Sequence, residues 1–327
     1  MYVIENELST ELVGFLQENG IIEVDEIVKL VEKPGEGNMN LVLRLITSKR
    51  SFILKQSRNF VQKYPSIPAP IQRILVEAEF YKTVTHHEFL KSKMPELLGF
   101  YPEQYLLVLE DLGQNSDFTS IYQPNSVLIE TDVLDLVSYL NQLHSIDIEQ
   151  YPSNDALKLL NYFHIFKFPF EEINGFDLDT IQKGLADIST KYKIDRVLKA
   201  KVDQLGEIYL ANGERLLHGD FYPGSWLKTD SGIKIIDPEF GYLGRAEFDL
   251  GVFTAHLVMA KKAHLIPIIA GNYKKTGQFS DQLMNAFAGV EIMRRLLGVA
   301  QLPLHLSISE KTEMLEWAFQ QIENYEN

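Results

Sequence analysis

The segment 216–251 gathers acidic residues in a pattern that could do chemistry. It reads LLHGDFYPGSWLKTDSGIKIIDPEFGYLGRAEFDLG and places Asp220, Asp237 and Asp249 after a turn, a short strand and a second turn. Asp220 is predicted to lie on a loop after a strand, where a carboxylate can accept a proton from a substrate hydroxyl. His218 can fix that loop through a hydrogen bond. Asp249 begins a predicted helix and is interpreted as a structural brace for the loop.

Asp237 follows the apolar run IKII and is expected at the mouth of a strand. Magnesium takes a few carboxylate ligands there and leaves its other positions to phosphate oxygens and water. Glu239 would point to the same side if the backbone stayed extended. We therefore predict that Asp237 and Glu239 bind Mg²⁺. The alternative for Asp237 is an ordinary acid that ends a strand.

A glycine-containing turn lies upstream, in GEGNMN at 35–40. The backbone amides of Gly35, Gly37 and Asn38 could approach a phosphate closely. The spacing departs from the glycine loop of protein kinases, because Asn40 stands where the third glycine would be. As a lone signal the turn is also compatible with a plain hairpin.

Lys55 closes the apolar run SFILK, which indicates the end of a buried strand. In kinases a lysine in this place contacts nucleotide phosphates and a glutamate of the following helix. Glu77 is the predicted partner and Glu79 the second choice. Both could instead belong to a solvated face, which is usual for Lys and Glu.

The order of these features carries more information than any one of them. A glycine turn, a strand lysine, a helix glutamate, the linker LEDL, a His-x-Asp loop and a later Asp form the plan of a two-lobed phosphotransferase that uses ATP and Mg²⁺. By position, the backbone of Glu110, Asp111 and Leu112 would bind the adenine edge. Asp220 would then orient the acceptor hydroxyl.

The elements around these residues change in character along the chain. The first part is β-rich, with strands expected at 26–33, 40–47, 51–56, 96–101 and 105–110, a short helix at 9–19 that ends at Gly20, and a longer helix at 70–85. The second part is mostly helical, with helices expected at 129–145, 177–193, 196–211, 246–263, 281–300 and 309–325. Its strand-like pieces are short and lie at 214–217, 225–228 and 233–236. We predict an α+β protein with an N-lobe at 1–111 and a C-lobe at 112–327.

Composition limits the partners. The 327 residues favour two domains, and the net charge of −14 argues against nucleic acid or an anionic membrane. The chain has no cysteine, so it has neither disulfides nor thiolate metal ligands. No signal peptide and no apolar run of membrane length is visible. We expect a soluble, cytoplasmic protein.

The chain resembles the aminoglycoside phosphotransferase and choline kinase-like superfamily, which shares the protein kinase fold. Within it, the motifs are most similar to those of methylthioribose kinases. The matching segments are HGDFYPGS at 218–225, IDPEF at 236–240, GEGNMN at 35–40 and RRLLG at 294–298. The resemblance runs from about residue 10 to about residue 303.

The resemblance implies a kinase-like fold and transfer of the γ-phosphoryl group of ATP to a sugar hydroxyl, as of 5-methylthioribose in methionine salvage. Arg294 and Arg295 match arginines associated with the sugar, and we expect one of them to pair with Glu247 or Asp249. Ser225 stands where most relatives have a metal-binding Asn, so it is a candidate metal ligand beside Glu239.

Three departures concern the acceptor. Tyr222 and Pro223 replace the family's usual His and Thr at two positions that would face the acceptor, and the chain is shorter than typical members. An aminoglycoside- or choline-type kinase therefore stays open, since Tyr222, Trp226 and Tyr242 could surround a quaternary ammonium. A catalytically inactive nucleotide-binding regulator is the alternative from another class. A homodimer is common among the resembling enzymes.

Overall fold

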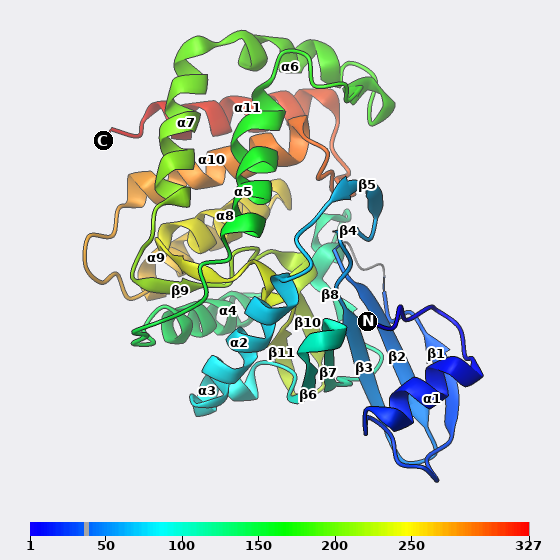
Figure 1. Ribbon diagram of the computed structural model, residues 1–327. Coiled ribbons are helices and arrows are strands. Elements are labelled where there is room, and N and C mark those ends of the chain that lie inside the picture. Colours follow the sequence, from blue (N-terminus) through cyan, green and yellow to red (C-terminus); the bar gives the residue numbers. More distant parts are fainter. Residues whose placement is uncertain (36–38, 327) are drawn as a thin grey trace. The chain divides into compact units, whose positions relative to one another are not determined.

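The computed structural model describes residues 1–35 and 39–326, which form two compact units (Figure 1). The first unit comprises 1–116 and 227–240, and the second comprises 117–226 and 241–327. The predicted lobes, 1–111 and 112–327, differ from these units chiefly in the segment 227–240. As functional lobes they stay a prediction.

A five-stranded antiparallel sheet with the order β1-β2-β3-β7-β6 forms the centre of the first unit. Its strands are β1 (Val28–Glu32), β2 (Leu41–Thr47), β3 (Ser51–Gln56), β6 (Leu97–Tyr101) and β7 (Leu106–Glu110). The predicted meander of the first three strands is confirmed. Lys55 lies opposite Val42 on one side and Leu107 on the other, so its strand is flanked on both edges.

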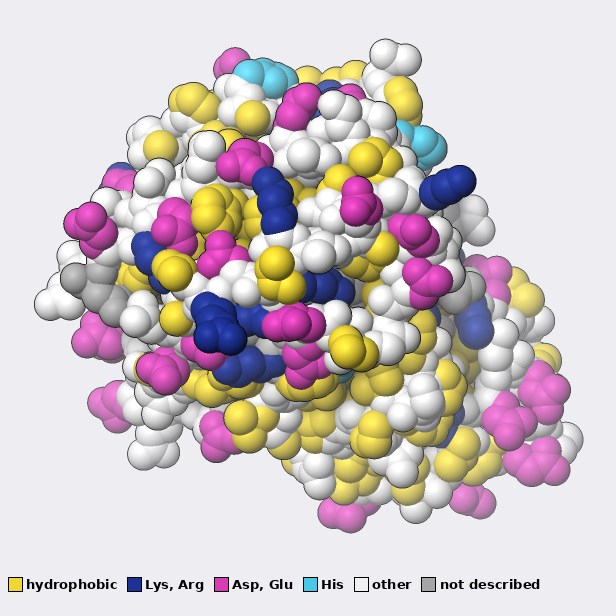
Figure 2. Space-filling view, turned by 90° about the horizontal axis from the view of Figure 1, so that it is seen from above, with side chains coloured by type: hydrophobic (Ala, Val, Ile, Leu, Met, Phe, Trp, Pro, Cys, Tyr) yellow, Lys and Arg dark blue, Asp and Glu magenta, His cyan; other side chains and the backbone are white. Residues whose placement is uncertain are grey.

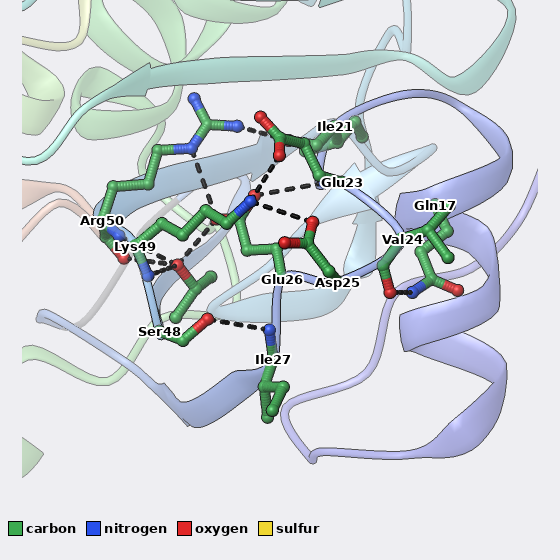
Figure 3. A network of polar contacts seen from close by, with 11 residues as sticks. Gln17, Ile21, Glu23, Val24, Asp25, Glu26, Ile27, Ser48, Lys49 and Arg50 are labelled. Carbon is green, nitrogen blue, oxygen red and sulfur yellow. Dashed lines mark hydrogen bonds and ion pairs between the residues drawn. The ribbon is translucent and has the colours of Figure 1, made fainter.

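Helix α1 (Thr10–Glu18) covers part of this sheet (Figure 1). Its N-cap Ser9 accepts a hydrogen bond from the Leu12 amide, and Leu12 and Leu16 are buried in one cluster with strand residues such as Leu43. Figure 3 shows how the turn between β2 and β3 is tied to the segment after α1. There Lys49 forms ion pairs with Glu23 and Asp25.

Helix α2 (Arg73–Thr85) carries two buried charged residues, Arg73 and Glu77, four positions apart and therefore on one face. This confirms the helix predicted at 70–85. The remaining elements of the unit are β4 (Phe60–Val61), β5 (Tyr64–Pro68), α3 (Glu88–Ser92) and β11 (Gly232–Ile235). The strands β8 (Ser116–Asp117) and β10 (Trp226–Thr229) each include one residue that is assigned to the second unit. The amide of Ile235 donates to the Lys93 carbonyl at 2.7 Å, which holds the end of β11 beside the residue after α3.

The second unit is mainly helical. Its helices are α4 (Glu130–Leu143), α5 (Asp155–Tyr162), α6 (Leu185–Ile194), α7 (Arg196–Leu210), α8 (Glu247–Met259), α9 (Ile266–Asn272), α10 (Asp281–Leu297) and α11 (Ile308–Glu323). Strand β9 (Arg215–Leu217) pairs with β12 (Tyr242–Gly244). The helix expected at 177–193 is wrong in its first half, because Gly184 adopts a left-handed φ of 91° and α6 begins only after it. Helices α5 and α9 were not predicted.

Helices α8, α10 and α11 pack closely at two glycines (Figure 1). A Cβ on Gly251 of α8 would lie 2.7 Å from the Met284 carbonyl oxygen of α10. A Cβ on Gly289 of α10 would lie 2.5 Å from the Ala318 carbonyl oxygen of α11. Both distances are too short for a side chain, so glycine permits the helices to approach. Helix α10 is held tightly between its two neighbours.

Both acidic and basic side chains lie on the surface of the protein. On the face seen in Figure 2, acidic and basic side chains are interspersed. Within 1–35 and 39–326, no helix is both long and apolar enough to span a bilayer.

Candidate active site

Lys55 is the centre of a charged cluster in the first unit. Its Nζ lies 2.7 Å from Glu77 Oε1 and 2.7 Å from Asp237 Oδ1. Glu77, and not Glu79, is thus the helix partner. Glu79 instead pairs with Lys82 at 3.6 Å on the exposed side of α2. The antiparallel strand and the face of α2 bring together three residues that are far apart in the sequence.

Burial and the neighbouring charges have opposite effects on the pKa values of Lys55 and Glu77. Burial lowers the pKa of Lys55, but the negative charges of Asp237 and Glu77 outweigh this effect and raise the net pKa above its ordinary value. Burial also raises the pKa of Glu77, against the opposing effect of Lys55. The second oxygen of Glu77, Oε2, is buried and has no hydrogen-bond partner among the described residues. The ammonium is therefore kept protonated and fixed in place.

Asp237 departs from the expected backbone conformation. It has a φ of 60°, in the left-handed region, and Pro238–Phe240 forms a 3₁₀ turn. The expectation that Asp237 and Glu239 share one side of an extended segment is therefore wrong. The Asp237 side chain is 48% exposed and contacts Lys55 through Oδ1, whereas Glu239 is buried.

Glu239 belongs to a buried polar network that sequence reasoning missed. Its Oε2 accepts from Asn40 Nδ2 at 2.9 Å and lies 3.2 Å from Arg73 Nε. Asn40 Oδ1 in turn accepts from Arg73 Nε and from Ser57 Oγ, each at 3.0 Å. Burial raises the pKa of Glu239, partly offset by Lys55 and Arg73. The network links the end of the glycine turn to the segment after Asp237.

The glycine turn itself is described only at its ends. Gly35 lies within the described residues, whereas Gly37 and Asn38 lie outside them. After the turn, the Met39 carbonyl accepts from Arg73 Nη2 at 2.7 Å. Arg73 therefore contacts both Met39 and Asn40, and its position on α2 fixes where the turn returns to the sheet.

The predicted adenine-binding segment follows β7. Glu110 is the last residue of that strand, and its amide donates to the Glu96 carbonyl at 2.9 Å. The Asp111 carboxylate accepts from Arg44 Nε at 3.0 Å, and the Leu112 carbonyl accepts from Asn115 Nδ2. The side chains here hold the segment in shape. Adenine binding by its backbone stays a prediction.

The loop that carries Asp220 follows β9 in the second unit. Asp249, which is fully buried, accepts from the backbone amides of His218 at 2.7 Å and Gly219 at 3.0 Å. His144 Nε2 lies 3.2 Å from the same carboxylate. Gly219 has a φ of 82°, which favours glycine. Asp249 thus holds the backbone directly before Asp220, the geometry expected of a brace.

The Asp220 carboxylate is buried for the most part, with 20% of the side chain exposed, and Oδ1 lies 3.5 Å from Arg295 Nη2. Burial raises the pKa of Asp220, and the positive charges of Arg295 and Arg294 offset part of that rise. Ser225 is also buried, and its hydroxyl donates to the Asp220 carbonyl at 3.0 Å. This contact closes the loop. The role of Ser225 as a metal ligand stays a prediction.

Arg294 and Arg295 both lie on α10, and their acid partner is Glu291. Glu291 Oε2 accepts from Arg294 Nη1 at 2.8 Å, and Oε1 accepts from Arg295 Nε at 2.6 Å. The expected pairing with Glu247 or Asp249 is wrong, because Glu247 pairs with Arg245 and Asp249 is occupied by the loop. Sequence reasoning missed Glu291, although its spacing of three and four residues from the arginines is the signal of such pairs.

Tyr222 lies beside this arrangement. Its ring is 4.9 Å from the Arg295 guanidinium carbon, which is cation–π contact distance. The second unit therefore presents a carboxylate, a guanidinium and an aromatic ring together. Within 1–35 and 39–326, no cluster of three or more His, Asp or Glu side chains is arranged to hold a metal ion by itself.

Known proteins are similar to this chain in sequence and in fold. The family described as "Phosphotransferase enzyme family" matches residues 31–282, more than half of the chain. Methylthioribose kinase from Exiguobacterium sibiricum is 26% identical, and the alignment covers 87% of this chain and 84% of that enzyme. Methylthioribose kinase from Klebsiella pneumoniae is 28% identical over 73% of this chain and 62% of its own length.

The fold is also similar to a solved structure, that of choline kinase LicA from Streptococcus pneumoniae. The TM-score is 0.55 at 12% identity, with 97% of this chain and 100% of that chain covered, and a structure of LicA in complex with AMP is similar to the same degree. The predicted kinase-like α+β fold is thereby confirmed. Together with the family match, it shows that the chain belongs to the phosphotransferase enzyme family.

Proposed function

We propose that the protein is an ATP- and Mg²⁺-dependent kinase that phosphorylates a hydroxyl group of 5-methylthioribose. The observation that carries the proposal is the similarity to methylthioribose kinases, which in one case extends over 84% of the relative. The charged clusters around Lys55 and Asp220 supply the groups that such a reaction needs. Phosphoryl transfer depends mainly on positioning and on charge stabilisation, so a fixed lysine and a held carboxylate are suitable parts.

The first unit would bind ATP. Lys55, fixed by Glu77, would contact the phosphates, and the backbone of 110–112 would contact adenine. Asp237 fits a magnesium ion, because its carboxylate is half-exposed and only one of its oxygens is engaged with Lys55. Glu239 is the second proposed ligand, held by Arg73 and Asn40. The bound ion would neutralise charge on the phosphate oxygens.

The second unit would bind the acceptor. Asp220 would accept the proton of the attacking hydroxyl, and its loop is held by Asp249. Arg295 lies close enough to Asp220 to contact a neighbouring oxygen of the same sugar. Arg294 and Tyr222 complete the proposed acceptor residues.

A choline-type acceptor is disfavoured by the aromatic residues. Trp226 and Tyr242 are almost fully buried, and Trp226 packs on Phe221 and Phe253 in the interior. Neither can present a face to a quaternary ammonium, and the ring of Tyr222 is already covered by a guanidinium. The alternative of an inactive regulator needs no acceptor at all. A homodimer and a cytoplasmic location stay predictions.

Measuring ATP consumption with a panel of acceptors tests the proposal. We expect Mg²⁺-dependent turnover with 5-methylthioribose, and none with choline, homoserine or kanamycin. Turnover with ribose alone, or with kanamycin alone, would replace the acceptor while leaving the phosphotransferase assignment intact. Binding of Mg·ATP by calorimetry without turnover on any acceptor would favour the inactive regulator.

The role of Glu239 leads to a second prediction. Glu239→Gln keeps the shape and can still accept from Asn40, but it removes the anion. If Glu239 binds magnesium, we expect the Mg²⁺ concentration for half-maximal activity to rise about 10-fold or more, since metal ligands and their supports contribute on this scale. Glu79→Gln, on the exposed side of α2, is the matched control. An unchanged magnesium dependence in a folded Glu239→Gln protein would assign Glu239 to the Arg73 network alone.

A further inference from the structure

A chain of hydrogen bonds between buried polar side chains leads to Arg295 in the second unit. The Tyr122 hydroxyl lies 2.5 Å from His256 Nδ1, and His256 Nε2 lies 3.2 Å from Glu291 Oε1. That same oxygen accepts from Arg295 Nε at 2.6 Å. Tyr122 comes from the 3₁₀ turn Phe118–Tyr122, His256 from α8 and Glu291 from α10. All three residues are buried.

Chemistry fixes the direction of these hydrogen bonds. Burial raises the pKa of Glu291, but Arg294 and Arg295 outweigh it and hold the pKa well below its ordinary value, so the group is a carboxylate. Burial lowers the pKa of His256 to about 4, so the imidazole is neutral. A carboxylate only accepts, so His256 Nε2 must carry the hydrogen. Nδ1 therefore accepts from the Tyr122 hydroxyl.

These contacts restrict the Arg295 side chain. Its Nε is held by Glu291, its Nη1 lies 3.4 Å from the Ala300 carbonyl, and Tyr222 packs on its face. The remaining Nη2 edge lies 3.5 Å from Asp220 Oδ1. A planar guanidinium held at Nε and on its face has little freedom to rotate, so its free edge has a defined direction.

We propose that His256 and Tyr122 are positioning residues for acceptor recognition, which act through Glu291 to hold Arg295 beside Asp220. The proposal rests on the proposed function, because it assumes that Asp220 and Arg295 face the acceptor. The favoured acceptor class is one with oxygens on adjacent carbons, since one oxygen can contact Asp220 while its neighbour contacts Arg295. Neither His256 nor Tyr122 touches the reacting atoms.

Four variants test this role. His256→Leu removes both hydrogen bonds, whereas His256→Gln can place its amide nitrogen near the site of Nε2 and keep the donor to Glu291. Tyr122→Phe removes only the hydroxyl. Thr254→Val, on the same helix, is the control, because the buried Thr254 hydroxyl has no hydrogen-bond partner among the described residues.

We expect His256→Leu to raise the acceptor KM about 10-fold or more, as for loss of a hydrogen bond to a charged group, while the KM for ATP stays the same. His256→Gln should recover most of the loss, Tyr122→Phe should show a smaller rise, and Thr254→Val should show none. Equal changes in both KM values, or no rescue by Gln, would mean that His256 serves packing only. If His256→Leu does not fold, an unchanged acceptor KM in Tyr122→Phe overturns the proposal.

A spectroscopic readout separates this inference from the proposed function. In protein labelled with ¹⁵N-arginine, the Nε–H resonance of Arg295, assigned with Arg295→Lys, reports its hydrogen bond to Glu291. We expect this resonance to shift in His256→Leu and to return in His256→Gln. A resonance that is the same in wild type and in folded His256→Leu would overturn the positioning role. Absence of turnover by the wild-type protein would instead refute the proposed function, with the resonance still deciding the inference.

Discussion

Asp220→Asn is expected to lower kcat for phosphoryl transfer by about 10³-fold, within the range by which a positioned general base accelerates reactions. Asparagine has almost the same shape as aspartate, but its amide cannot take up the proton of the attacking hydroxyl. ATP is assigned to other residues, so its binding should change little. Steady-state kinetics with the accepted sugar, together with calorimetric titration of Mg·ATP, measures both quantities.

Asp230→Asn is the matched control for Asp220→Asn, because Asp230 is exposed in the turn between β10 and β11. Its kcat should equal that of wild type. A folded Asp220→Asn protein that retained more than a tenth of the wild-type kcat would show that Asp220 is not the base. The charge of Arg295 would then be the main candidate for the contribution of this cluster to kcat.

Lys55→Met is expected to have the second large effect, on both activity and stability. It leaves Glu77, which is fully buried, without its cationic partner. Removing one member of a buried ion pair typically costs about 3–5 kcal/mol of unfolding free energy. The value of kcat/KM for ATP should also fall by about 10²-fold or more, since a contact to the phosphates is lost. Denaturant unfolding and ATP turnover measure the two effects separately.

The double variant Lys55→Met/Glu77→Gln distinguishes them further. It removes the unpaired charge, so we expect most of the stability to return while ATP turnover stays low. Lys82→Met, at an exposed position of the same helix α2, should change neither property. Recovery of turnover in the double variant would mean that Lys55 acts only on the fold of the first unit.

Much of the first cluster could be predicted because its signals are local. An apolar run that ends in Lys55 indicates a buried strand end, and an apolar face that contains Glu77 indicates a buried helix position. The packing of helix α2 beside strand β3 then brings the two charges together, and Lys55 Nζ lies 2.7 Å from Glu77 Oε1. The antiparallel meander before them was predictable for the same reason.

Asp237 shows what local signals cannot predict. The residue before a proline is normally extended, so the spacing of Asp237 and Glu239 favoured two carboxylates on one side. The left-handed φ of Asp237 sends them in different directions instead. Glu239 accepts a hydrogen bond from Asn40, which is 199 residues away in sequence. No pattern near Asp237 contains that information.

The residues around Arg295 also include some that local signals predict and some that they do not. Glu291 could have been found from its helical spacing to Arg294 and Arg295. The contact of Tyr122 with His256 spans 134 residues and joins a turn to a helix, so no periodicity indicates it. The candidate site is thus predictable where the segment around each residue indicates its element and its burial, as for Lys55 and Glu77. It is not predictable where a contact such as that of Tyr122 with His256 has no local signal.

The glycine contacts on either side of α10 have a consequence for how acceptor preference could evolve. Gly251 and Gly289 admit no side chain, so α10 can neither shift nor rotate without breaking its contacts with α8 and α11. If Arg294 and Arg295 bind the acceptor as proposed, we expect these two residues and their partner Glu291 to be the constant part of the acceptor site. A descendant of this protein with another acceptor would keep that helix and diverge in the loop 221–225, where Tyr222 lies.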